Sequence, residues 1–90
     1  MKTIRYSTKY KKDIKRYARN EKFLEALLDI VKLLEQGKPI PAEHRPHPLK
    51  GEYKECMECH VLSDFLLIWY DEAADTIWLE RVGTHSELFK

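Results

Sequence analysis

The sequence has little cysteine and glycine, and no apolar run approaches the ~20 residues needed to span a bilayer. Its two cysteines, Cys56 and Cys59, are too few and too close together to staple a secreted mini-domain. The N-terminal segment is basic and rich in tyrosine, which excludes the apolar stretch of a signal peptide. We therefore expect a soluble, cytoplasmic protein without a membrane partner, held together by packing or by a binding partner.

The length and composition predict one folded domain over residues 1–90. A chain of 90 residues buries only about 60% of the surface that its unfolded form exposes, so it can build one core but not two. With 43% apolar and 34% charged residues, the composition is typical of globular domains and not of disordered tails.

Charge is distributed unevenly along the chain. Residues 1–22 contain nine Lys or Arg and two Asp or Glu, a net charge of +7, whereas residues 23–90 contain seven and thirteen, a net charge of −6. The two sums give the overall +1. A concentration of basic charge is typical of a surface that binds a polyanion, although a solvated lysine-rich helix gives the same count.

The first half of the chain predicts a strand and two helices. Residues 3–6 are β-branched and aromatic, and Ser7 suits the N-cap of a helix over residues 8–20 that has a basic outer face. A broad apolar stripe predicts a core helix over residues 21–36, ending at Gly37.

The second half predicts a long loop and three antiparallel strands. All four prolines fall within residues 37–51, where they exclude helix and central strand. Strands are expected over residues 53–62, 65–70 and 76–82, joined by short turns. A last helical turn, capped by Thr84 or Ser86, should end in Leu88 and Phe89.

The predicted fold class is α+β, with two helices on one face of an antiparallel sheet of about four strands, in the order β-α-α-β-β-β. Successive side chains of a strand point to opposite faces of the sheet. This places Met57, Cys59 and Val61 on one face and Glu58, His60 and Leu62 on the other. If the first group faces the helices, His60 lies on a sheet face left free for substrate.

Histidine is the residue type that suggests chemistry. Three of the four histidines, His47, His60 and His85, lie beside loops, strand ends or the terminus. Cleavage of RNA without a metal needs a base for the 2′-OH, an acid for the 5′-oxygen and cations for the phosphorane, which two histidines and a Lys or Arg can supply. Each histidine taken alone is more often an ordinary surface residue, and we interpret His44 in that way.

Other residues have structural explanations of their own. Asp64 follows Ser63 in a tight turn, and Arg81, which alternates with Glu80 along its strand, could belong to a cross-strand ion pair. Lys50 and Lys54 could be ordinary solvated charges.

A structural zinc site is a competing interpretation, because His44-x-x-His47 and Cys56-x-x-Cys59 supply two ligands each. The two cysteines lie in a strand-like run, where positions three apart point to opposite faces. A redox pair is disfavoured because no βαβ pattern surrounds these cysteines. We therefore predict no metal and no cofactor.

Three sequence blocks resemble a known family. They are HPLKG at residues 47–51, CHVLSDFLLIWY at 59–70 and ERVGTHSELF at 80–89. In order and spacing they resemble the YafQ branch of the RelE-type toxins, which implies a RelE-like fold and a toxin of a type II toxin-antitoxin pair. The implied activity is ribosome-dependent endonucleolytic cleavage of mRNA in the decoding site.

The resemblance also implies site residues, which are His47, His60, Asp64, His85 and Phe89. His85 and His60 would be the acid–base pair, Asp64 a base or an orienting carboxylate, and His47 a phosphate or proton-transfer contact. Arg81 would stabilise the phosphorane, and Phe89 would either stack on a base or anchor the C-terminus in the core. The remaining candidates for RNA binding are Lys50, Lys54, Lys11, Lys15 and Arg19.

The chain departs from the family pattern at two positions. Met57 stands where relatives often have an arginine, and Ser63 stands where they have a proline. Lys50 or Lys54 could substitute for the missing arginine.

Expected partners are an antitoxin, the ribosome with mRNA, and operator DNA only through the antitoxin complex. Two other functions remain open: a ParE-like toxin that binds gyrase without catalysis, and a nucleic-acid-binding module, perhaps with zinc, whose function lies in the basic helix. ParE-type toxins lack the histidine set, so the histidines favour the nuclease.

Overall fold

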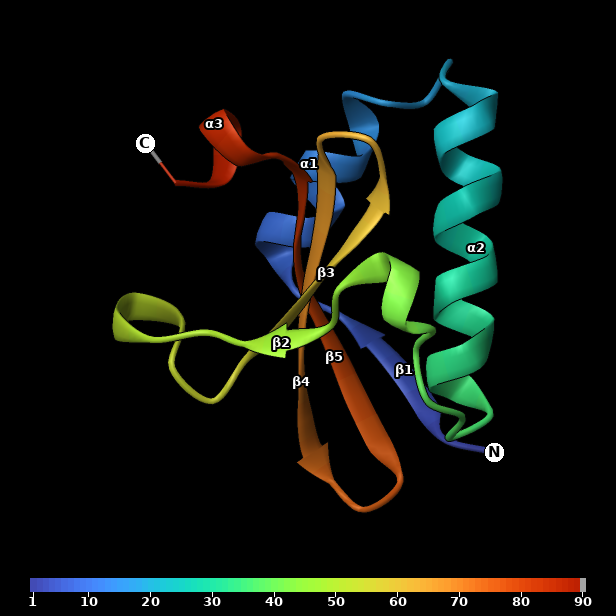
Figure 1. Cartoon of the computed structure of the whole chain (residues 1–90), viewed down its shortest axis with the longest axis vertical. Helices are drawn as coiled ribbons and strands as arrows, with labels where there is room; N and C mark the ends of the chain where they lie inside the picture. Colours follow the sequence, from blue (N-terminus) through green and yellow to red (C-terminus); the bar gives the residue numbers. More distant parts are fainter. Residues whose placement is uncertain (90) are drawn as a thin grey trace.

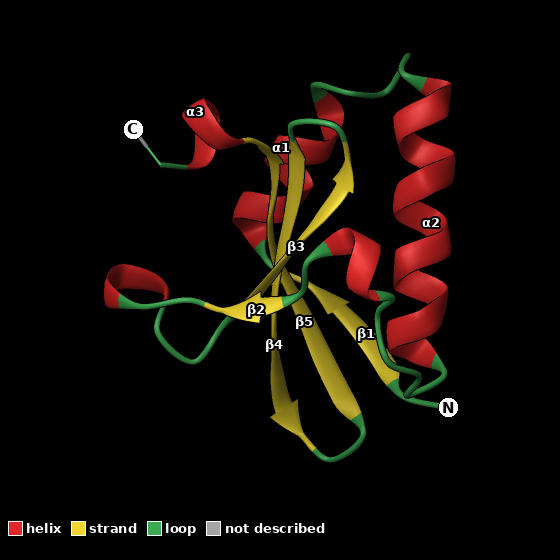
Figure 2. Ribbon diagram, in the orientation of Figure 1, coloured by secondary structure: helices red, strands yellow, loops and turns green. Residues whose placement is uncertain are grey.

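The computed structural model describes residues 1–89 and contains a five-stranded sheet with helices on both sides (Figures 1 and 2). The strands are β1 (Thr3–Tyr6), β2 (His47–Pro48), β3 (Met57–Leu62), β4 (Phe65–Ala73) and β5 (Thr76–Thr84). The helices are α1 (Thr8–Lys15), α2 (Glu21–Glu35) and α3 (His85–Leu88), with 3-10 helices η1 (Ala42–His44) and η2 (Gly51–Tyr53). No helix among these residues is long and apolar enough to cross a membrane.

The sheet order is β1-β5-β4-β3-β2, and β1 runs parallel to β5 while the other neighbouring pairs are antiparallel. The α+β class is therefore confirmed, but the sheet is mixed and has five strands instead of about four. The additional strand, β2, lies in the proline-rich loop that we expected to be irregular. Strand β2 is only two residues long and lies at the edge of the sheet, where it can include Pro48 because an edge strand can lack one N–H donor.

Helix α2 covers one face of the sheet, as Figure 1 shows. Asn20 caps its first turn by accepting a hydrogen bond from the amide of Phe23, and Gly37 takes φ of 70° just beyond its end, as predicted. Its buried side chains pack on the sheet and form what we call the helix-side core. The core contains Phe23, Leu27, Ile30 and Leu34 of α2 with Cys59, Val61, Leu67, Trp69, Ile77, Leu79 and Val82 of the sheet.

Helix α1 is shorter than the predicted 8–20, because hydrogen bonds of the i→i+3 type replace the α-helical pattern from Arg16 onward. It continues the edge of the sheet where β1 ends. Ser7 caps the helix and donates a 2.6 Å hydrogen bond to the carbonyl of Glu80, and Asp13 accepts one of 3.1 Å from the amide of Val82. Side chains of α1 and its N-cap thus form hydrogen bonds with backbone groups of β5 beyond the end of β1.

Strand β3 begins at Met57 and not at the predicted residue 53. Tyr53 lies in η2, and Glu55 has φ of 74°, which interrupts the extended chain. Strands β4 and β5 extend past the predicted ends at residues 70 and 82, and the predicted turn at Ser63 and Asp64 is confirmed.

The predicted alternation along β3 holds for all but one residue. Met57, Cys59 and Val61 face the helix-side core, as expected. Leu62 also packs there, because the pairing with β4 shifts register between His60 and Leu62. The prediction that Leu62 shares a face with His60 is therefore wrong.

The opposite face of the sheet is only partly open. Leu88 of α3 packs there on Leu66 and Ile68 of β4, with Cys56 and the half-buried Tyr53 beside them. We call this group the outer cluster. Figure 1 shows α3 and η2 on this side, opposite α2. The expectation of a wholly free sheet face is wrong, since the C-terminal helix covers part of it.

Candidate active site

The predicted site residues on β2 and β3 share the face opposite α2. His47 pairs with Glu58 across β2 and β3, and His60 lies two residues beyond Glu58. Directly paired residues of antiparallel strands, and residues two apart on one strand, point to the same side. The sheet therefore presents His47, Glu58 and His60 together beside the outer cluster.

His47 is held by a buried carboxylate. Its Nε2 lies 3.0 Å from Oε1 of Glu58, and its Nδ1 lies 3.1 Å from the carbonyl oxygen of Pro48. Only a doubly protonated imidazole can donate to both oxygens at once. The second carboxylate oxygen of Glu58 is buried without a hydrogen-bond partner among the described residues. This arrangement suits His47 as a proton donor or a cation.

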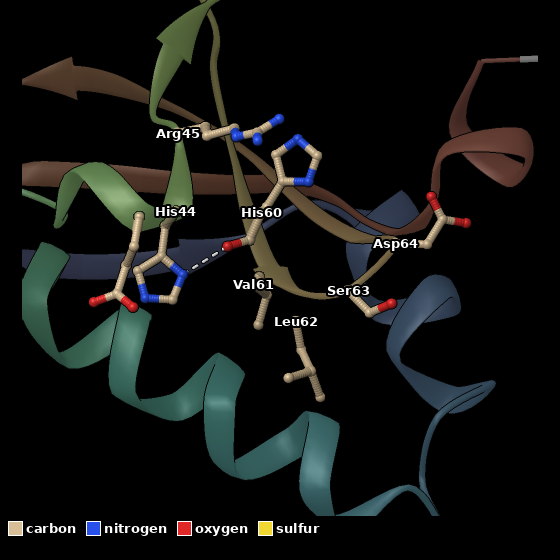
Figure 3. A pocket seen from close by; sticks show the side chains of 8 residues that line it. His44, Arg45, His60, Val61, Leu62, Ser63 and Asp64 are labelled. Atoms are coloured by element: carbon tan, nitrogen blue, oxygen red, sulfur yellow. Dashed lines mark hydrogen bonds between the residues drawn. The ribbon is translucent and has the colours of Figure 1, made fainter.

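His60 lines a cavity of about 660 Å³ between η1 and the β3–β4 turn (Figure 3). Its carbonyl oxygen accepts a 2.7 Å hydrogen bond from Nδ1 of His44. In Figure 3 the imidazole of His60 points away from α2, whereas Val61 and Leu62 point toward it. Asp64 lines the same cavity and is exposed. The structure thus brings together the histidine and the aspartate of the H-x-x-x-D block.

Helix α3 presents the C-terminal candidates. Thr84 and Glu87 form a capping box, so His85 begins the helix with its side chain exposed. The rings of His85 and Phe89 lie 5.0 Å apart between centroids. Phe89 is 36% exposed, while its neighbour Leu88 is buried. Leu88 is therefore the C-terminal anchor in the core, and Phe89 keeps an accessible face.

Glu87 connects α3 to the turn that follows α1. Its carboxylate accepts hydrogen bonds from the hydroxyl of Tyr17 and from the amide of Thr84, and it lies 3.4 Å from a guanidinium nitrogen of Arg16. The hydrogen bond from Tyr17, followed by the one from Thr84, lowers the pKa of Glu87 to about 2. A carboxylate held in this way fixes the position of His85 relative to α1.

Arg81 forms its ion pair with Asp13 of α1 and not with a residue of a neighbouring strand. Its Nε and one terminal nitrogen donate to the two carboxylate oxygens of Asp13 at 2.7 and 3.1 Å, and the other terminal nitrogen donates to the Tyr53 hydroxyl at 3.2 Å. The hydrogen bond to Asp13 raises the pKa of Arg81. Tyr53 in turn contacts Phe89, with ring centroids 5.8 Å apart. Arg81 therefore supports the aromatic side of the site, with two N–H groups left for a ligand.

The other predicted RNA-binding cations are exposed and lie on different elements. They are Lys11 and Lys15 of α1, Arg19 in the following turn, Lys50 before η2 and Lys54 after it. Met57 packs against the helix-side core. A side chain at this position points away from His60, so its difference from relatives does not remove a cation from this face.

The cysteines and histidines of the proposed zinc set are not gathered. Cys59 lies in the helix-side core and Cys56 in the outer cluster. Burial raises the pKa of the Cys59 thiol to about 12, so it is a poor thiolate ligand. Within residues 1–89, no group of three or more His, Cys, Asp or Glu is placed to hold a metal ion.

Sequence reasoning missed three residues of this region. Glu58 could have been found, because it shares the period of His60 and is acidic in a strand with one buried side. Asp13 was hidden in a lysine-rich helix and is only 3% exposed. Tyr53 was assigned to a strand. Their partners are 11, 68 and 28 residues away along the chain, beyond the reach of local patterns.

Known proteins are similar to this chain in both sequence and fold. A family model described as "Bacterial toxin of type II toxin-antitoxin system, YafQ" matches residues 2–90. The mRNA interferase toxin YafQ of Escherichia coli strain K12 is 37% identical over 87 residues, covering 96% of this chain and 94% of that protein. Among solved structures, YafQ from E. coli strain BL21(DE3) superposes with a TM-score of 0.89 at 31% identity over the full length of both chains. The E. coli DinJ-YafQ complex contains a chain with a TM-score of 0.85 and 32% identity, again over both full lengths.

Proposed function

Because this chain belongs to the YafQ family of bacterial type II toxins, we propose that it cleaves mRNA in the decoding site of the ribosome. Its relatives carry the name mRNA interferase, so the chain is an endoribonuclease that blocks translation. We also propose that cleavage takes place in the cytoplasm, on the ribosome, by acid–base catalysis on the sheet face that carries His47 and His60.

The observation that carries the proposal is the pair of histidines on one sheet face, with a third on the helix that borders this face. His60 and His85 form the acid–base pair: one removes the proton of the 2′-OH as its oxygen attacks phosphorus, and the other protonates the departing 5′-oxygen. Asp64 acts as a base or orients a histidine. His47 contacts a phosphate or transfers a proton, and the guanidinium of Arg81 stabilises the charge on the phosphorane.

The side chain of Phe89 stacks on a base of the message, a contact worth about 1 to 3 kcal/mol. The exposed cations Lys50 and Lys54 hold phosphates beside the site, and Lys11, Lys15 and Arg19 extend the contact to other phosphates.

As a type II toxin, the chain has an antitoxin partner, and relatives have been crystallised with theirs. We place an acidic, amphipathic segment of the antitoxin against α1 and α2. An apolar groove of about 170 Å³ lies between these helices, where Tyr6 is 47% and Leu28 is 53% exposed. Helix α1, which contributes Tyr10 and Ile14 to this groove, also carries four lysines, and this favours an acidic partner. Operator DNA would then be bound through the antitoxin.

The test is cleavage of mRNA during in vitro translation, with the cut ends mapped by primer extension. The wild type should produce codon-phased cuts that need ribosomes, and His85→Ala and His60→Ala should not. Translation blocked without cuts, or unaffected, would refute the nuclease mechanism.

A further inference from the structure

The cavity beside His60 is lined by a cationic side chain, that of Arg45, which has no role in the proposed mechanism. Arg45 and His44 line it from η1, and His60, Ser63 and Asp64 line it from β3 and the following turn. Figure 3 shows the Arg45 side chain directed toward the imidazole of His60. A guanidinium next to a candidate acid or base is suited to a phosphate at that position.

A hydrogen bond from the side chain of His44 adds to the β2–β3 pairing in holding the segment that carries Arg45 against β3. Among residues 1–89, strand β2 pairs with β3 only at Met57 and Glu58, and no other strand lies beside β3 farther along this edge. His44 takes over this role by donating to the carbonyl of His60 at 2.7 Å. It satisfies an edge acceptor and at the same time places the next residue, Arg45, beside the His60 side chain.

The backbone of Arg45 is itself unusual. It has φ of 49° and ψ of 53°, the left-handed conformation in which glycine is favoured. A residue with a side chain adopts this conformation at a cost in free energy. Here the conformation ends η1 and turns the Arg45 side chain toward the cavity.

Arg45 also differs from the other arginines near the site in its partners. Arg81 is paired with Asp13, and Arg16 lies against Glu87. Within residues 1–89, no carboxylate lies within the 4.0 Å of an ion pair with Arg45, although Glu43 and Asp64 line the same cavity. Its guanidinium is therefore available to an external anion.

We propose that Arg45 binds a phosphate of the RNA strand in the cavity beside His60, and that His44 is the positioning residue that holds it there. The inference rests on the proposed function only in taking RNA as the ligand. The cavity accommodates a phosphodiester with part of a nucleotide, and Arg45 and His60 then contact one phosphate from two elements.

The first test measures binding of a short single-stranded 2′-O-methyl RNA, which lacks the nucleophile, to the isolated toxin. Arg45→Gly removes the cation and suits the left-handed backbone, so it should leave folding intact and weaken binding about tenfold. The slope of log Kd against log salt concentration should decrease by about 0.7, the value for one phosphate contact on a single strand. Lys38→Ala, with the same loss of charge in a residue that lines a different cavity, should do neither.

Two further variants separate charge from positioning. Arg45→Lys retains the positive charge, so the slope of log Kd against log salt concentration should stay as in wild type. His44→Ala should weaken binding as Arg45→Gly does, and His44→Gln, which retains a donor, should recover part of it. Equal affinity and slope in wild type and Arg45→Gly, or no binding by the wild type, would overturn the proposal.

Cleavage on programmed ribosomes distinguishes this inference from the proposed function. If wild type and Arg45→Gly both cleave, with the same half-saturating ribosome concentration, the role of Arg45 is refuted and the proposed nuclease function is not. Wild type that binds RNA through Arg45 but does not cleave on ribosomes supports the binding site and refutes the ribosomal nuclease.

Discussion

Asp13 of α1 holds Arg81 of β5 through hydrogen bonds of 2.7 and 3.1 Å, although 68 residues separate them along the chain. The same carboxylate accepts the amide of Val82, so one nearly buried side chain satisfies three donors. The pair joins the N-terminal helix to the strand that leads into α3.

Replacing Asp13 with alanine should destabilise the protein strongly. The change leaves the amide of Val82 without a partner and the guanidinium of Arg81 with only the Tyr53 hydroxyl, in a region of low exposure, which should cost about 3 kcal/mol in urea unfolding. Asp29→Ala, at an exposed position of α2, should cost less than about 0.5 kcal/mol. A loss below about 1 kcal/mol for Asp13→Ala would mean that the pair is not important for stability.

Glu58→Gln should reduce cleavage with little effect on folding. The amide keeps the size of the side chain but not the charge that holds His47, and a loss of about tenfold in rate corresponds to 1.4 kcal/mol of transition-state stabilisation. Single-turnover cleavage on programmed ribosomes measures the effect, with Glu25→Gln on the exposed side of α2 as the control. Equal rates in Glu58→Gln and wild type would show that the contact does not support catalysis.

Glu87 should make stability depend on pH in an acidic window. Its pKa is about 2 in the folded protein, against 4.5 for the unperturbed group, so its ionised form is favoured by folding. That stabilisation is complete above pH 4.5 and is lost as the pH falls from there toward 2. Wild type should therefore exceed Glu87→Gln in unfolding free energy at neutral pH, and the difference should shrink through this window. A constant difference would contradict the assignment.

The last two apolar residues should separate stability from activity. Leu88→Ala removes a buried side chain of the outer cluster and should cost about 2 to 4 kcal/mol in unfolding free energy. Phe89→Ala should leave stability within about 1 kcal/mol, because Phe89 is 36% exposed, and should slow cleavage about tenfold through lost stacking. The opposite pattern would make Phe89 the anchor.

Local patterns predicted the elements well. Ser7, Gly37 and the Ser63–Asp64 turn mark element boundaries in the structure, because capping and turn formation depend on a few adjacent residues. The parallel pairing of β1 with β5 could not be predicted, since it joins residues 3–6 to residues 76–79 and leaves no mark in either strand.

The candidate site was predictable in part for the same reason. Period-2 alternation placed His60 on the correct face, and the resemblance supplied His47, His85 and the rest. The alternation failed at Leu62, where the register shift follows from pairing with β4 and not from residue type. His44 could be interpreted only as an ordinary surface residue, and nothing in the sequence marks Arg45, because their role depends on the fold of the proline-rich segment over the edge of β3.

The pairing of β1 with β5 has a consequence for synthesis of the toxin. The first strand emerges from the ribosome long before its partner at residues 76–79 exists, and Asp13 must wait for Arg81 in the same way. His85 and Phe89 are made later still than residues 76–79. A chain released early lacks both the closing strand and the residues that we assign to catalysis, so a truncated product should be harmless to the cell that makes it.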